Sequence, residues 1–233
     1  MDLAGPGLHV IFGLPKREMK FTLNDALLNK ITPRQAAIDL TKRLGIQKGK
    51  LVFVPAGYKA ESIVDILKKG YELTTLRTAF EELSSDYSLD CLLIDTQPGI
   101  DKPTLLAIGL CDVILLITRI DKQDIFGSAV TLEVAKALNK PVYLVANMIP
   151  PRAEKKKMDE RLERIFGVPV IAEIPYYPDV HEHLSSGIFL LENPDHEFSQ
   201  KIKSLTKDLI ELTSKQNERE QGPQTPLQRS HQA

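Results

Sequence analysis

The residues of this chain that could do chemistry follow short apolar runs. In an open parallel sheet, ligands bind beyond the carboxyl ends of the strands, so polar residues at those positions are candidates for a binding site. Turns also favour Asp, Asn, Pro and Gly, and a set of ordinary turns is therefore the alternative interpretation. The candidate residues are Asp95, Gly99, Asn147, Pro175 and Asp179.

The segment LLIDTQPG, residues 92–99, has the most specific pattern. Asp95 at the end of a buried apolar strand is the Walker B arrangement, in which the carboxylate holds Mg²⁺ or its water shell beside a phosphate. The Pro98–Gly99 turn that follows lets the backbone approach a terminal phosphate closely. An aspartate that caps a helix or stabilises a turn is the alternative.

The elements that must position these residues alternate along the chain. The apolar runs are nearly continuous, which is typical of strands covered on both faces, and helical spacing of large apolar residues fills the segments between them. We therefore predict an α/β fold with a mainly parallel sheet and helices on both faces. The predicted strands are residues 51–55, 91–96, 113–119, 142–148 and 168–175, and the predicted helices include 22–30, one opened by Thr32–Pro33, 73–87, 123–139 and 198–212.

Composition narrows the class of protein. The 233 residues carry 30 basic and 31 acidic side chains, and this balance argues against a protein that holds nucleic acid through bulk positive charge. Only two cysteines, Cys91 and Cys111, are present, which excludes a disulfide framework and favours a cytoplasmic location. No apolar stretch approaches the roughly 20 residues that span a bilayer. We predict one domain, residues 1–213, and a disordered polar tail, residues 214–233, which lacks the apolar face of a membrane anchor.

Other polar segments point to no further activity. Residues 152–164 mix basic and acidic side chains as a solvated helix face does, and no recognition helix or other clear nucleic-acid motif is present. His181 and His183 are two positions apart and would point apart on a helix, so we expect no shared metal ion.

Several segments, in this order and spacing, resemble the MinD/ParA family of deviant Walker A ATPases, from about Asp2 to about Leu212. Residues 1–13 resemble switch I and residues 92–99 resemble switch II. The other matching segments are 21–40 with its TLND start, 51–57 ending in Pro-Ala-Gly, 144–151 and 174–180.

The resemblance implies a P-loop NTPase-like fold, ATP and Mg²⁺ as cofactors, and slow ATP hydrolysis. Relatives use this cycle as a switch that controls the localisation or partitioning of a partner, so a nucleotide-dependent homodimer and an unidentified protein partner are expected. The implied roles are Asp95 at Mg²⁺, the Gly99 N–H at the terminal phosphate, Asn147 at adenine, Pro175 and Asp179 beside the base, and Asp2 as the catalytic residue near the attacking water.

The sequence departs from the family in one respect. The family's Gly-rich loop, whose N–H groups and lysine hold the phosphates, has no counterpart, because Gly5, Gly7 and Gly13 are not followed by Gly-Lys-Ser/Thr. We therefore expect an N-terminally incomplete ATPase in which the first strand, loop and helix, roughly 30 residues or more, are absent. A non-catalytic interaction module on the same scaffold is the alternative, and a ligase or synthetase of the superfamily is a third possibility.

Overall fold

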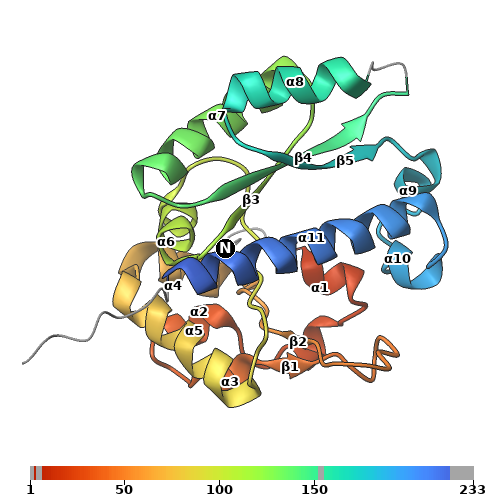
Figure 1. Ribbon diagram of the computed structural model, residues 1–233. Helices are drawn as coiled ribbons and strands as arrows, with labels where there is room; N and C mark the ends of the chain where they lie inside the picture. The colour runs from red at the N-terminus through yellow and green to blue at the C-terminus, as the bar shows by residue number, and fades with distance from the viewer. Residues whose placement is uncertain (1–2, 4–6, 152–154, 221–233) are drawn as a thin grey trace, which may run out of the picture.

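A computed structural model describes residue 3, residues 7–151 and residues 155–220 of the chain (Figure 1). Its main sheet is parallel, in the strand order β3-β4-β5, and β1 and β2 form a separate antiparallel pair. The strands are β1 (Ile38–Asp39), β2 (Val52–Phe53), β3 (Ile114–Thr118), β4 (Val142–Ile149) and β5 (Val170–Pro175).

Helices fill most of the chain between the strands. Three short helical segments, α1 (Leu8–Ile11), η1 (Lys16–Glu18) and α2 (Leu23–Leu27), precede α3 (Pro33–Ala36). The remaining helices are α4 (Ala60–Lys69), α5 (Leu73–Tyr87), α6 (Lys102–Leu110), α7 (Lys122–Ala137), α8 (Lys155–Phe166), α9 (Pro178–Glu182), α10 (Phe189–Glu192) and α11 (Glu197–Glu220).

The parallel sheet has helices on both faces because side chains alternate along its strands. Leu144 in β4 packs in a core with Leu132 of α7 and Phe166 of α8, whereas its neighbour Val145 packs in a second core with Leu205 of α11. Figure 1 shows α7 and α8 on one side of the sheet and α11 across the other. The predicted fold class, a parallel sheet between helices, is confirmed.

A separate apolar cluster joins the helices of the first half of the chain. Leu23 and Leu27 of α2 meet Ile66 of α4 and Leu76 of α5, and the half-buried Ile94 packs against them. The Thr22 hydroxyl and the Asp25 carboxylate form a reciprocal capping box at the start of α2, which fixes where this helix begins. This cluster positions the chain on either side of the predicted switch II segment.

The prediction of a strand over residues 91–96 is wrong. This segment has no hydrogen-bonded neighbour in the described residues, and a strand exists only where a ladder can form. Leu93 is 81% exposed, and Ile117 in β3 is 57% exposed, so neither side chain is covered as the continuous apolar run indicated. The predicted strand 51–55 is also reduced to Val52–Phe53, which pairs with β1 in antiparallel register.

The end of the chain differs in part from expectation. Helix α11 runs to Glu220 and so continues past residue 214, where the polar tail was predicted to begin, and residues 221–233 lie outside the described residues. In the ranges that the structure covers, no helix has the length and apolar character needed to cross a membrane.

Candidate functional site

Asn147 lies at an irregularity in β4 that turns it out of the regular ladder. The register between β4 and β5 shifts between Ala146 and Ile149, and Met148 between them has a left-handed φ of 55°. The Asn147 Oδ1 accepts the Met148 N–H at 2.9 Å, which leaves the Nδ2 amide as the group available to a ligand. Bulges of this kind re-aim side chains at functional edges of sheets.

Pro175 ends β5 at the same edge. It is the register partner of Ile149, and the N–H of the following Tyr176 donates to the Ile149 carbonyl at 2.9 Å. Asn147 and Pro175 therefore lie on adjacent strands at their carboxyl ends, and both are half-buried. Among the predicted site residues that the structure describes, these two lie in paired strands of the sheet.

Asp179 lies in the first turn of α9, four residues beyond Pro175, and is exposed. Its Oδ2 is 2.8 Å from Nε2 of His196, and Nδ1 of His196 accepts the Phe198 N–H at 3.1 Å. The Tyr177 ring stacks edge-on against His196 at a centroid distance of 5.3 Å. The carboxylate is thus held by a histidine that the sequence analysis did not single out.

Asp95 and Gly99 lie together on the irregular segment between α5 and α6, and both are exposed. Gly99 has φ of 98°, a conformation that favours glycine, and no atom lies within 4 Å of the place where its Cβ would be. The backbone at Gly99 is therefore open to close approach by a ligand.

Asp101 holds the end of this segment as the N-cap of α6. Its Oδ1 accepts the Thr104 N–H at 2.8 Å, and its Oδ2 accepts the Gln97 side-chain amide. Burial opposes ionisation, but the hydrogen bonds from Thr104 and Gln97 hold the pKa of the Asp101 carboxyl below its ordinary value. Burial, and next the Asp101 charge, raise the pKa of Tyr71 to about 12.

The sequence analysis did not identify Asp101 as the N-cap of a helix, although the residues after it indicate a helix start. Asp101 is followed by Lys102 and Pro103, and an Asp ahead of a proline in the first turn is typical of a helix start. No sequence pattern indicated the His196 contact, because it joins α9 to the residues before α11. Asp2, the predicted catalytic residue, lies outside the described residues.

The residues present suit Mg²⁺ as this ion is bound in nucleotide sites. Mg²⁺ keeps several waters and takes one or two carboxylates together with the phosphates of its ligand, rather than a full protein cage. The exposed Asp95 carboxylate, four residues before Gly99 on the same segment, supplies such a single oxygen donor. The described residues hold no cluster of three or more His, Cys, Asp or Glu side chains that could hold a metal ion.

No protein-family model matches the chain. A protein of Methanocaldococcus jannaschii, described as an uncharacterized ATP-binding protein, is 26% identical over 211 residues, which cover 90% of this chain and 74% of that protein. The septum site-determining protein MinD of Pyrococcus horikoshii, solved with Mg-ADP, matches with a TM-score of 0.74 and 19% identity over 92% of this chain and 83% of that chain. A ParA family ATPase of Chlorobium tepidum matches with a TM-score of 0.64 and 17% identity over 85% and 80% of the two chains.

The resemblance predicted from the sequence is confirmed, and the chain has the α/β fold of the MinD and ParA family ATPases.

Proposed function

We propose that this protein is a nucleotide-dependent switch of the MinD/ParA type, which binds ATP with Mg²⁺ and hydrolyses it slowly. The observation that carries the proposal is that Asn147 and Pro175 lie at the carboxyl ends of adjacent parallel strands, where Pro175 pairs with Ile149, two residues beyond Asn147. The ATP-binding description of the Methanocaldococcus protein and the Mg-ADP bound to the Pyrococcus MinD support the choice of nucleotide.

The adenine base would lie against the β4–β5 edge. The Asn147 Oδ1 is occupied by the Met148 N–H, so the Nδ2 amide donates to a ring nitrogen of the base. Pro175 contributes an apolar surface without an N–H of its own, and the Asp179 carboxylate is held beside it by His196.

The phosphates would lie near the segment between α5 and α6. The Gly99 N–H would donate to the terminal phosphate, and the free space where a Cβ would lie lets the phosphate approach the backbone closely. Asp95 would hold Mg²⁺ or its water shell, and the ion supplies neutralisation of the phosphate charge when it is bound. Asp2 would orient the attacking water.

Control of a partner is the output of this switch. We propose that nucleotide binding promotes a homodimer and that hydrolysis ends its interaction with a protein partner, whose localisation or partitioning depends on that cycle. The exposed switch segment is suited to this role, since a segment outside the sheet ladder can change conformation at small cost in hydrogen bonds.

Titration calorimetry of the purified chain with Mg-ATP tests the proposal. Asn147→Ala removes one hydrogen bond to the base and is expected to weaken binding about tenfold, since 1.4 kcal/mol corresponds to that factor. Gln200→Ala, which removes an amide from α11, is the matched control and should leave the affinity unchanged. Unchanged affinity in Asn147→Ala, or no binding of Mg-ATP to the wild-type chain, would contradict the proposal.

Release of inorganic phosphate separates the switch from its alternative. Slow release that requires Mg²⁺ supports the ATPase, whereas nucleotide binding without any release supports the non-catalytic interaction module. Light scattering with and without Mg-ATP measures the proposed dimer directly.

A further inference from the structure

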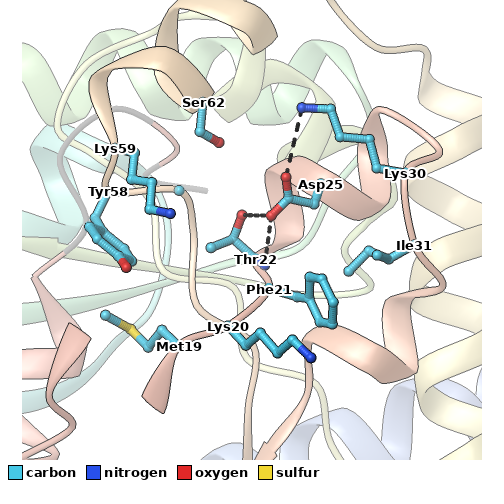
Figure 2. Close-up of a pocket in the computed structure, with 11 residues that line it drawn as sticks. Met19, Lys20, Phe21, Thr22, Asp25, Lys30, Ile31, Tyr58, Lys59 and Ser62 are labelled. Carbon is cyan, nitrogen blue, oxygen red and sulfur yellow. Dashed lines mark hydrogen bonds and ion pairs between the residues drawn. The ribbon is translucent and has the colours of Figure 1, made fainter. Parts of the chain in front are cut away.

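A pocket of about 280 Å³ lies between two segments that supply none of the predicted nucleotide residues. Residues 19–31, around α2, form one wall, and residues 57–62, at the start of α4, form the other. Figure 2 shows the Lys59 ammonium and the Ser62 hydroxyl directed into the space between these walls, across from Thr22 and Asp25.

Gly57 and Ser62 lie in the wall of this pocket, and the side chain of Asn24 packs against Gly57 without lining the pocket. Asn24 is fully buried, and its Oδ1 accepts the Gly57 N–H at 2.8 Å, which leaves Nδ2 as a donor. Neither Asn24 Nδ2 nor the buried Ser62 Oγ has a hydrogen-bond partner within the part of the chain that the structure describes. A Cβ on Gly57 would lie 2.6 Å from Ser62 Oγ and 2.7 Å from Asn24 Nδ2, so only glycine lets these two groups pack this closely against the backbone.

The same wall carries positive potential. Lys59 is the N-cap of α4, and no side chain caps the first N–H groups of this helix, which therefore present partial positive charge. No ion pair involves Lys59 within residues 7–151 and 155–220. Three lysines line the pocket against one carboxylate, that of Asp25, which is already bonded to Thr22 and lies 3.9 Å from Lys30. Glu61, in the first turn of α4, is exposed and lies outside the pocket wall.

We infer that this pocket binds a small oxyanion, a phosphate or carboxylate group. The Ser62 hydroxyl donates to one of its oxygens, and Lys59 together with the N-terminus of α4 neutralises its charge. A buried donor without a partner is unfavourable, and an oxyanion in the pocket would satisfy the Ser62 hydroxyl. The site is separate from the proposed nucleotide site in the residues it uses.

Thermal unfolding of the full chain in a zwitterionic buffer tests this site, with inorganic phosphate, malonate or chloride added at equal ionic strength. Phosphate or malonate is expected to raise the melting temperature above that in chloride. A response to phosphate alone indicates a phosphate ligand, and a response to malonate alone indicates a carboxylate. Equal melting temperatures in all three salts would overturn the inference.

Two variants test whether the anion-dependent rise in melting temperature comes from this pocket. Lys59→Gln and Ser62→Ala should each raise the half-saturating anion concentration about tenfold, whereas Lys68→Gln, an exposed lysine in the last turn of the same helix, should not change it. Without anion, Ser62→Ala should be as stable as the wild type, because its hydroxyl has no protein partner. An unfolded Ser62→Ala chain, or an unchanged response in both variants, would show that these groups have a structural role only. Loss of Mg-ATP binding in Asn147→Ala with the anion response retained would keep this site distinct from the nucleotide site.

Discussion

Removal of the Asp101 carboxylate is expected to destabilise α6 and with it the end of the predicted switch II segment. In the structure Asp101 accepts the Thr104 N–H at 2.8 Å and also accepts the Gln97 amide. The variant Asp101→Ala loses both bonds and exposes the first turn of α6. The variant Asp101→Asn retains a side-chain oxygen for the Thr104 N–H but loses the charge and the acceptor for the Gln97 amide.

The expected loss in the free energy of unfolding is the sum of the contributions of the two hydrogen bonds. An N-cap substitution by alanine costs about 1 kcal/mol, and the loss of the partly exposed Gln97 bond adds roughly 0.5 kcal/mol. We therefore expect Asp101→Ala to lower the free energy of unfolding by about 1.5 kcal/mol at pH 7, and Asp101→Asn by about 0.5 kcal/mol, since Asn and Asp are comparable caps. For a chain of this size, 1 kcal/mol corresponds to about 2–4 °C in melting temperature.

The effect should depend on pH in a defined direction. The pKa of Asp101 in the folded chain lies below its ordinary value of 3.8, so its contribution to stability is fully present above that pH. The contribution is lost as the pH falls below 3.8 and through the lower folded pKa. The difference between the wild type and Asp101→Ala should therefore be constant from pH 5 to 8, values chosen to lie above 3.8, and should shrink below pH 4.

Urea denaturation followed by far-ultraviolet circular dichroism measures these differences. Asp90→Ala, at an exposed aspartate between α5 and α6, removes the same charge without removing a helix cap and is the control. A loss in Asp101→Ala no larger than in Asp90→Ala would refute the reasoning that the carboxylate holds the start of α6. A pH-independent difference would refute the assigned direction of the pKa.

Three further predictions follow from buried or perturbed groups. Leu144→Ala should lower the free energy of unfolding by about 2–5 kcal/mol, because the fully buried side chain leaves a cavity between β4 and α7 that denaturation can measure. Tyr71→Phe should leave the chain as stable or up to about 1 kcal/mol more stable by the same assay, since the buried hydroxyl has no partner among the described residues. Burial, then the Asp112 and Asp90 carboxylates, raise the pKa of the Cys91 thiol, so its reaction with a disulfide reagent at pH 7 should be slower than that of free cysteine and should accelerate with pH. A stability loss in Tyr71→Phe, or a Cys91 thiol as reactive as free cysteine, would contradict the surroundings given for those groups.

The sequence correctly predicts the three strands of the parallel sheet and the helix α5. The apolar runs at 113–119, 142–148 and 168–175 become β3, β4 and β5, and the helical spacing at 73–87 becomes α5 (Leu73–Tyr87). These predictions succeed because a continuous apolar run and a 3.6-residue period each report how a segment is buried, which is a local property of the residues.

Pairing between strands is not a local property. Residues 91–96 are as apolar as β3, yet they form no strand because nothing described pairs with them, and Leu93 remains 81% exposed. The same reasoning explains why β2 is only two residues long, since its ladder is limited to the pairing with β1. A β-strand requires a partner that can lie far away in the sequence, so residue type alone overestimates strands.

The sequence by itself determined the chemistry available at the candidate site: an aspartate and a glycine after one apolar run, and an asparagine and a proline after two others. The tertiary structure decided which of them meet. Parallel pairing of β4 and β5 brings Asn147 and Pro175 to the same edge of the sheet, and the irregularity at Met148 directs the asparagine. His196, which follows α10 in the chain, contacts Asp179, which precedes it. The tertiary structure also brings Asn24 and Ser62 together at Gly57. These two residues are 38 positions apart in the sequence and meet because α2 packs against α4. Such contacts depend on how separate elements pack, and that information lies in no single stretch of the chain.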